Sequence, residues 1–387
     1  MKKKAFIATI GTGKGVEDGI NFSIKEQNPS HIYLIVTKDS IKTAENLKKI
    51  VGEHDENIEF DLMNIEDEND VEAIFKEIST LVLNILKEGF SKNQIIADYT
   101  SGTKAMSAAL VLAAVEHQID RLSYVHGTRN PETGRVESGS ERVKSLSPKI
   151  VFEKKIIEQT AFLHNNYQFK AAINIIDNHS FSKKIKPYAD IIKQLAEAHD
   201  SWDKFRFNDA KDKFSKIDPK ISKSIKIQKA LLNINAWLNR INKDCGPKLE
   251  SDCQLLQTDL FYNAQRRGEE GKYDDGVARL YRLLEMIIQS EYIKIHKVNS
   301  GRPLQETWEV IKNIESRIIK ALNQREDEIK KIQSARNNSI LAHGKNPISK
   351  ETYEKFKEIV YEILIPSESV EFVKININNL NEVIISS

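Results

Sequence analysis

Cysteine is scarce in this sequence of 387 residues, and long apolar runs are missing from it. Cys245 and Cys253 have no histidine or carboxylate at metal-ligand spacing beside them, so we expect ordinary thiols and neither a disulfide framework nor a zinc site. Apolar runs such as 108–115 fall far short of the ~20 residues that a membrane-spanning helix needs. The first residues lack the apolar core of a secretory leader, which favours a cytoplasmic protein without a membrane partner.

An excess of one charge sign is also missing. The chain has 58 Lys and Arg residues against 56 Asp and Glu residues, so attraction of the whole chain to nucleic acid is not indicated. Any contact with nucleic acid must therefore be local. Apolar residues make up 40% and charged residues 29%, which excludes collagen-like and largely disordered classes. The length exceeds one ordinary core and suits two or three domains.

Short β-branched runs alternate with helical patterns from residue 4 to about residue 147. The segment 71–87 between two runs carries the apolar stripe of an amphipathic helix. Strands that alternate with helices predict an α/β, Rossmann-like domain with a parallel sheet. In such a sheet, ligands bind beyond the carboxyl ends of the strands. The expected strands cover 5–10, 31–36, 58–62, 94–98 and 122–125.

Beyond Pro148 the pattern becomes mostly α-helical. Three stretches share an aromatic residue, a short polar step and a small residue at the start of an amphipathic helix, and they begin at Tyr167, Phe207 and Tyr273. Their irregular spacing favours a helical bundle that reuses one hairpin device over a solenoid. The run 243–248 is the clearest helix break in this half. The expected domains are a Rossmann-like domain over 1–148, a helical connector over 149–250 and a helical bundle over 251–387.

Two glycine-containing loops follow the expected first and fourth strands, and should border one crevice. Glycines let the backbone approach a ligand, N–H groups at a helix start favour anions, and hydroxyl and ammonium groups add donors. Either loop alone is equally typical of a tight turn, but together they indicate a phosphate or nucleotide pocket. The residues expected to bind the ligand are Thr9, Gly11, Thr12, Gly13, Lys14, Thr100, Ser101, Gly102, Thr103, Lys104 and Met106.

Neither loop carries a Walker A or dinucleotide-binding signature, because the required Lys-Ser/Thr pair and third glycine are missing. The segment 98–106 instead resembles the Asp-x-Thr-(Ser/Gly)-Gly-Thr-Lys-x-Met signature of CARF domains, the CRISPR-associated Rossmann-like sensors of cyclic oligoadenylate. The segment 124–129 also looks like a later ligand-side segment of that family. The resemblance implies a homodimer in which paired loops face one ring-shaped ligand. Rings of four and of six adenylates both remain open.

A second polar segment, 334–344, contains Arg336 and His343. On an unbroken helix these two residues would share a face, about 10.5 Å apart along the axis. Gly344 would then follow the helix and leave His343 at its terminus, where the helix dipole favours imidazolium. A polar helix end with a capping histidine, or a solvated turn at Asn337-Asn338, is the alternative interpretation.

The same segment resembles the signature of HEPN ribonucleases, in which Arg is followed after four to six residues by His, often with Asn after the Arg and Gly after the His. The expected helix 273–285 resembles the first HEPN helix of CRISPR-associated proteins. The resemblance implies metal-independent cleavage of single-stranded RNA. His343 would exchange protons at the 2′-oxygen or the 5′-leaving oxygen, Arg336 would stabilise charge on the phosphate, and Asn337 would position it. Products would carry a 2′,3′-cyclic phosphate and a 5′-hydroxyl, and DNA would resist cleavage because it lacks the 2′-hydroxyl.

A sensor followed by a ribonuclease is the order found in ancillary effectors of type III CRISPR systems. We therefore expect a homodimeric antiviral endoribonuclease that cyclic oligoadenylate activates, without a metal or other cofactor. The sensor pocket is also a candidate site for slow cleavage of the activator. Two alternatives stay open: a catalytically inactive sensor that binds a partner, and a toxin-like ribonuclease that ignores nucleotides. A test for RNA cleavage separates the first alternative, and the ligand dependence of the rate separates the second.

Overall fold

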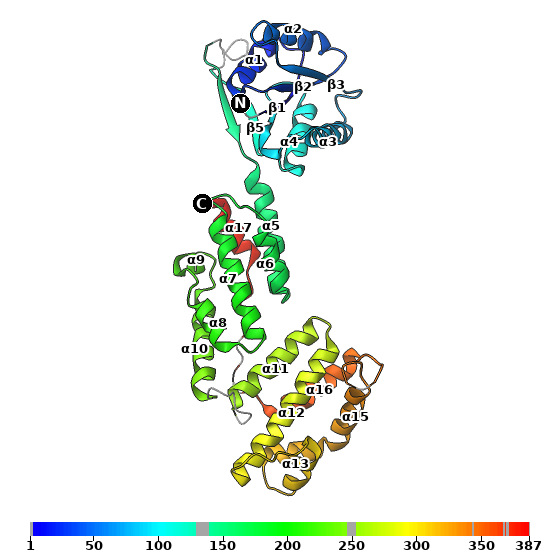
Figure 1. The fold of residues 1–387 in the computed structure, drawn as a ribbon, viewed down its shortest axis with the longest axis vertical. Helices are drawn as coiled ribbons and strands as arrows, with labels where there is room; N and C mark the ends of the chain where they lie inside the picture. The colour runs from blue at the N-terminus through cyan, green and yellow to red at the C-terminus, as the bar shows by residue number, and fades with distance from the viewer. Residues whose placement is uncertain are drawn as a thin grey trace. The chain divides into compact units, whose positions relative to one another are not determined.

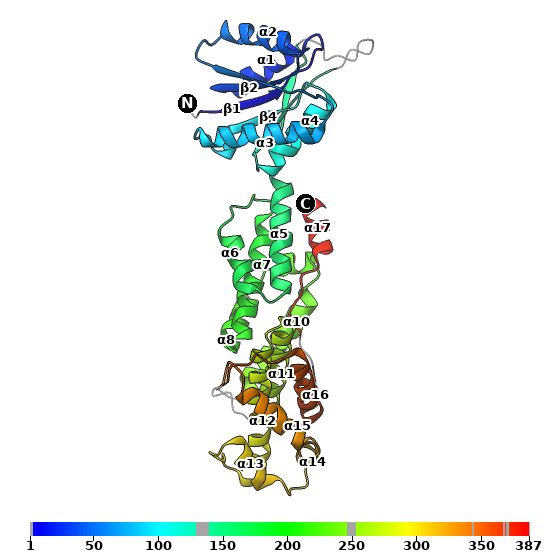
Figure 2. The same cartoon turned by 90° about the vertical axis from the view of Figure 1, so that its right-hand side faces the viewer.

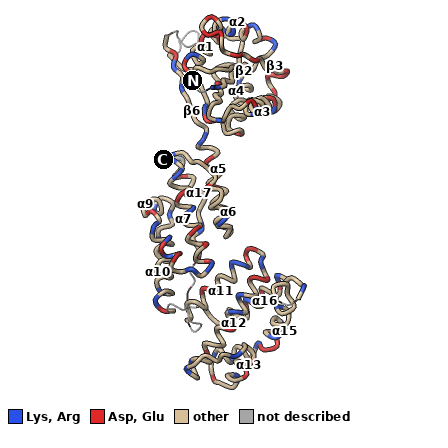
Figure 3. The backbone as a smooth tube through the Cα atoms, in the orientation of Figure 1, with Lys and Arg blue, Asp and Glu red and all other residues tan. Residues whose placement is uncertain are grey.

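The computed structural model describes residues 3–128, 139–245, 253–342, 344–366, 368 and 371–386. The chain divides into two compact units, Met1–Lys155 and Ile156–Ser387. Figures 1 and 2 show the α/β architecture of the first unit and the helical architecture of the second. Lys and Arg are interspersed with Asp and Glu along the helices of both units (Figure 3), in keeping with the balanced composition.

The first unit is built on a six-stranded sheet with the order β3-β2-β1-β4-β5-β6. All the expected strands form and pair in parallel: β1 (Ala5–Thr9), β2 (His31–Val36), β3 (Glu59–Asn64), β4 (Ile95–Asp98) and β5 (Arg121–His126). The edge strand β6 (Arg142–Leu146) runs antiparallel to β5 and was not expected. Its side chains are mostly exposed, so it lacks the apolar run that marks a buried strand. The expected Rossmann-like class is confirmed.

Two pairs of helices cover the two faces of this sheet (Figure 2). Ile7 of β1 packs with α3 (Val71–Lys87) and α4 (Lys104–Glu116). Its neighbour Phe6 packs with α1 (Val16–Gln27) and α2 (Ile41–Gly52), because successive strand residues point to opposite faces. Burial of both faces explains why the central strands are mostly apolar.

The strand order reverses between β1 and β4. From β1 the chain proceeds outward through β2 and β3, then crosses back to pair β4 with the other side of β1. At such a switch point the segments that follow the two strands diverge, leaving a crevice at the carboxyl ends. The loops after β1 and β4 therefore meet at one place, as the sequence predicted.

The second unit is helical, and the mostly α-helical class expected for this half is confirmed. The first helix, α5 (Lys149–Asn165), begins in the first unit and continues into the second. The helices up to residue 245 are α6 (Phe169–Asp177), α7 (Lys186–Asp203), α8 (Phe207–Phe214), α9 (Pro219–Ser224) and α10 (Gln228–Asp244). Those that follow are α11 (Gln254–Glu269), α12 (Tyr273–His296), α13 (Leu304–Ile311), α14 (Arg317–Gln324), α15 (Glu326–Asn337), α16 (Lys350–Leu364) and α17 (Ile377–Ser386).

One turn geometry recurs in the hairpins α5–α6, α7–α8 and α11–α12. A residue with positive φ stands in each turn, namely Tyr167 (61°), Phe205 (60°) and Gly271 (73°). The N–H of the next residue bonds to the carbonyl oxygen five positions earlier, at 2.9 Å in all three turns. This is the Schellman arrangement, which ends one helix and directs the chain into the next. The bundle therefore reuses one hairpin device, as the aromatic-polar-small pattern predicted.

After α16 the chain returns to the helices at the start of the second unit; we call residues 371–386 the return segment. The Asn165 side chain both donates to and accepts from the backbone of Ile375, at 2.9 and 2.8 Å. The Phe372 ring stacks on His199 with ring centroids 4.5 Å apart. His199 also contacts the ring nitrogen of His164 at 2.9 Å, and burial lowers the pKa of His164 to about 4. Figures 1 and 2 both show α17 beside α5.

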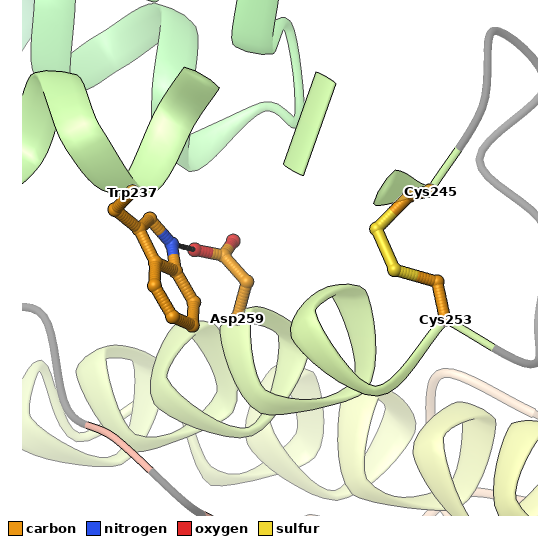
Figure 4. The surroundings of a disulfide bond; sticks show 4 residues. All are labelled: Trp237, Cys245, Cys253 and Asp259. Carbon is orange, nitrogen blue, oxygen red and sulfur yellow. Dashed lines mark hydrogen bonds between the residues drawn. A yellow bond between two sulfur atoms is a disulfide. The ribbon is translucent and has the colours of Figure 1, made fainter. Parts of the chain in front are cut away.

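Cys245 and Cys253 form a disulfide with their Cα atoms 5.1 Å apart (Figure 4). The expectation of two ordinary thiols was therefore wrong. Their spacing along the sequence did not reveal that the end of α10 faces the start of α11. Nearby, the buried carboxylate of Asp259 accepts hydrogen bonds from the indoles of Trp202 and Trp237 at 2.8 and 3.1 Å. Burial raises the pKa of Asp259, against the opposing effect of these donors.

Candidate functional sites

The loops after β1 and β4 are joined by hydrogen bonds. The Gly11 N–H donates to the Ser101 hydroxyl at 3.1 Å, and the Thr9 hydroxyl donates to the Ser101 carbonyl oxygen. A Cβ at Gly11 would lie 3.2 Å from the Gly102 nitrogen, so the two backbones approach closely here. These contacts show that the two loops lie side by side, as the sequence predicted; that they bind a ligand there stays a prediction.

Gly102 is required at its position by both conformation and space. Its φ is +89°, in the left-handed region that favours glycine. A Cβ there would lie 2.8 Å from the Cβ of Thr9. Any other residue would displace the loop that precedes α4.

Several of the expected ligand residues hold the loops in place. The Thr103 hydroxyl accepts from the Met106 N–H at 3.2 Å and donates to the Glu68 carbonyl oxygen at 3.0 Å. Thr9 and Met106 are fully buried, so their side chains support the crevice from below and do not face a ligand in this structure. Thr12, Gly13, Lys14 and Lys104 are exposed at the crevice.

A buried carboxylate fixes the backbone of the second loop. Asp98 accepts from the Ser23 hydroxyl at 2.6 Å and from the Thr100 N–H at 3.0 Å. Burial raises the pKa of Asp98, while these donors lower it. The Thr100 hydroxyl in turn accepts from the Val125 N–H of β5 at 2.8 Å. Ser23 was missed from the sequence because it lies 75 positions from Asp98 in a helix without a recognisable motif.

The electrostatics of the crevice favour an anionic ligand. Lys14 and Lys104 form no ion pair with any residue that the structure describes, so their charges are not neutralised there. Tyr99, which follows β4, and Tyr124 of β5 stack with ring centroids 5.3 Å apart beside the second loop. Within the described part of the chain, no cluster of three or more His, Cys, Asp or Glu side chains is arranged to hold a metal ion. No helix of that part is long and apolar enough to cross a bilayer.

The second candidate site lies where α15 ends. The helix stops at Asn337, so the unbroken helix that would place Arg336 and His343 on one face does not form, and the alternative of a turn at Asn337-Asn338 fits the structure. The weak helix formers Asn338 and Ser339 follow, and the chain turns back so that Ile340 donates to the Asn346 carbonyl oxygen at 3.2 Å. His343 lies outside the described residues.

Gly344 packs directly against the end of α15. Its N–H donates to the Ser339 carbonyl oxygen at 3.0 Å. A Cβ at this position would overlap the backbone of Asn338. Gly344 is therefore required for close approach of two chain segments, and not as the residue that ends a helix at 343.

Arg336 lies between its sequence neighbour and the long helix α12. Its Nη1 donates to the Asn337 side-chain oxygen at 3.1 Å, and its guanidinium carbon lies 4.8 Å from the centre of the Tyr281 ring. Burial and the nearby carboxylate of Glu285 raise the pKa of Tyr281, so the phenol is neutral beside the cation. Exposed Arg282, the residue after Tyr281, pairs with Glu285 at 3.0 Å.

Two family models match the second half of the chain. The model described as the Csm6 6H domain matches residues 152–245, and the model described as the Csm6 HEPN domain matches residues 246–301 and 295–366. The second range contains Arg336, Asn337 and Gly344.

Two individual proteins are also similar. The CRISPR system endoribonuclease Csm6 of Thermus thermophilus is 25% identical over 292 residues, which cover 71% of this chain and 56% of that protein. The match thus spans little more than half the length of this curated relative. The structure of Enterococcus italicus Csm6 bound to cyclic hexa-2′-fluoro-hexa-dAMP aligns over 99% of both chains, with a TM-score of 0.65 and 14% identity. At that identity the alignment shows a shared fold.

Proposed function

We propose that this chain belongs with the CARF–HEPN effectors of type III CRISPR systems and is an endoribonuclease activated by cyclic oligoadenylate. Its second half matches the models of the Csm6 6H and Csm6 HEPN domains, and its first unit contains the Rossmann-like sheet expected of a CARF sensor. The observation that carries this proposal is the guanidinium of Arg336. It lies within the HEPN match and has no carboxylate partner within 4.0 Å among the described residues. A charge held in this way is available to a phosphate.

The proposed substrate is single-stranded RNA, which supplies its own nucleophile in the 2′-hydroxyl. His343 exchanges a proton at the 2′-oxygen or the leaving 5′-oxygen, and Arg336 stabilises the charge that develops on the phosphate. Asn337 accepts a hydrogen bond from Arg336 and so orients the guanidinium. The products carry 2′,3′-cyclic phosphate and 5′-hydroxyl ends, and the reaction needs no metal ion.

The proposed activator site is the crevice between the loops after β1 and β4. Exposed Lys14 and Lys104 attract phosphates, and the start of α4 adds backbone N–H donors. In a homodimer, two such crevices facing each other across a two-fold axis would hold one ring. We assign sensing to residues 1–148, transmission to 149–250 and cleavage to 251–387, in a cytoplasmic antiviral role.

The test is cleavage of a labelled single-stranded RNA by the purified protein in EDTA, with no ring, a ring of four adenylates, or a ring of six. We expect RNA cleavage that depends on one of the two ring sizes and leaves cyclic-phosphate ends. DNA of the same sequence should not be cleaved. A strict requirement for added divalent metal would contradict the 2′-hydroxyl mechanism. Cleavage at one rate with and without a ring would favour the toxin-like alternative, and ring binding without any cleavage would favour the inactive sensor.

Replacing Lys104 by alanine is expected to weaken binding of the activating ring about tenfold or more, because one charge-assisted contact is lost from each sensor domain. Replacing Thr103 by valine removes the cap of α4 and the bond to Glu68, and should weaken binding less. Calorimetry measures both affinities. Lys87→Ala is the matched control, because Lys87 is exposed at the far end of α3. Unchanged affinity for Lys104→Ala would remove Lys104 from the site.

A further inference from the structure

The contact between Tyr281 and Arg336 joins two helices that are distant in the sequence. Tyr281 lies in α12 and Arg336 in the last turn of α15, and the guanidinium carbon is 4.8 Å from the ring centre. A guanidinium within about 6 Å of an aromatic centroid is attracted by the negative face of the ring. The contact therefore favours this position of the cation, although no motif in the sequence connects the two residues.

An aromatic ring holds an arginine differently from a carboxylate. A carboxylate would pair with the guanidinium through two N–H groups and neutralise its charge. Here no carboxylate of a described residue lies within 4.0 Å of Arg336, and Asn337 occupies only one Nη group. The remaining N–H groups and the full positive charge stay available to an anion.

The aromatic ring is carried by a helix that is packed in the core. Tyr281 is half-buried on α12, and its neighbours Leu280, Leu283 and Leu284 are fully buried in the helical core. Glu285, the nearest acidic residue of this helix to Tyr281, is engaged by Arg282 at 3.0 Å. An acidic group that could compete for Arg336 is thus directed to another cation.

We propose that Tyr281 is a positioning residue of the ribonuclease site, whose ring face orients the Arg336 guanidinium toward the scissile phosphate without neutralising its charge. This inference rests on the proposed function. Tyr281 does not touch the reacting atoms and acts through Arg336. It requires the aromatic face and does not require the phenolic hydroxyl.

Three variants test the proposal in the full-length protein with the activating cyclic oligoadenylate bound. Tyr281→Leu removes the aromatic ring and should lower kcat about three- to tenfold with little change in KM. Tyr281→Phe keeps the ring and should retain the parent kcat within about twofold. Tyr292→Leu makes the same change elsewhere on α12, where the ring contacts His296, and should leave both constants unchanged.

A double-mutant cycle shows whether the effect passes through Arg336. In single-turnover reactions, Tyr281→Leu should cause no further loss in an Arg336→Ala background. The proposal is wrong if Tyr281→Phe loses as much activity as Tyr281→Leu, or if the loss persists in the Arg336→Ala background. An increase in KM at constant kcat in Tyr281→Leu would show that the tyrosine ring binds RNA directly, which would also overturn the proposal.

A readout without catalysis separates this inference from the proposed function. In protein labelled with ¹⁵N-arginine, the Nε–H signal of Arg336 is identified by its loss in Arg336→Lys. The parent and Tyr281→Phe both have an aromatic ring at position 281, so their Arg336 signals should be shifted in the same way. In Tyr281→Leu, which lacks the ring, that shift should disappear. If the parent protein cleaves no RNA with either cyclic oligoadenylate, the proposed function fails. An unchanged Arg336 signal in Tyr281→Leu would show independently that the aromatic ring of Tyr281 does not hold the guanidinium.

Discussion

Replacing Arg336 or His343 by alanine is expected to lower ring-activated RNA cleavage about 10²–10⁴-fold, because each change removes a group that acts only when the phosphate reacts. Arg336 supplies a positive charge that no described carboxylate within 4.0 Å neutralises. In the proposed mechanism, His343 would supply the proton transfer. Binding of cyclic oligoadenylate should be unaffected, because its proposed site is formed by loops of the other compact unit.

Arg302→Ala is the matched control for Arg336→Ala. Arg302 is an exposed arginine in the turn before α13, and its side chain takes no part in the contacts of Arg336. It should retain most of the parent rate, because substitution of an exposed side chain away from a site usually changes free energies by no more than about 0.5 kcal/mol. Cleavage rates, ring affinity by calorimetry and thermal melting are measured for each variant. A folded His343→Ala protein that cleaves RNA at the parent rate would refute the catalytic assignment.

The same substitutions test the proposed homodimer. In-line transfer at phosphorus needs proton removal on one side and proton donation on the other, so two motifs facing each other would supply both. A purified heterodimer of one parent chain and one Arg336→Ala/His343→Ala chain should then have far less than half of the parent activity. Retention of about half would show two independent sites.

Gly344→Ala is expected to lower RNA cleavage about 10²-fold, although the added methyl group is small and apolar. The new Cβ would overlap the backbone of Asn338, so the segment after α15 must move away from the helix end. This segment joins Arg336 to His343, and a displacement of about 1 Å in a catalytic group is enough for a loss of this size. Single-turnover cleavage with saturating ring measures the effect.

Gly52→Ala is the control for this change. Gly52 ends α2, and a Cβ there meets nothing within 4 Å. It should leave cleavage and ring affinity unchanged. Ring affinity and the melting temperature of Gly344→Ala should also stay close to those of the parent, because the strain is confined to one loop. Parent-like cleavage by Gly344→Ala would mean that the close packing against Asn338 does not position the site.

The central sheet could be predicted because its residues are apolar on both faces. β1, β2 and β4 are fully buried and were recognised as runs, and their order along the chain placed the two glycine loops at one switch point. β6 could not be found in this way, because an edge strand with exposed side chains has no apolar signal. The roles of Thr9 and Met106 were also hidden, since burial depends on the packing of the whole sheet.

The segment 334–344 was singled out by its resemblance to the HEPN motif, but its geometry depends on tertiary contacts. Asn337 and Asn338 are weak helix formers, and the helix ends there and does not continue to residue 343. The contact of Tyr281 with Arg336 and the pairing of Cys245 with Cys253 join segments whose proximity is set by helix packing. A local pattern could indicate the residue types of the site, but not which distant residues hold them.

The return segment has a consequence for the order in which the chain folds during synthesis. The core that contains His199 and Trp202 receives the Phe372 ring, which contacts both side chains at centroid distances of 4.5 Å. Helices α5–α10 therefore leave the ribosome long before their core can be completed. Domains generally fold from the N-terminal end as they emerge, but here the helices of residues 254–364 are made in between. The core of helices α5–α10 thus closes last, after helices α11–α16 have been synthesised.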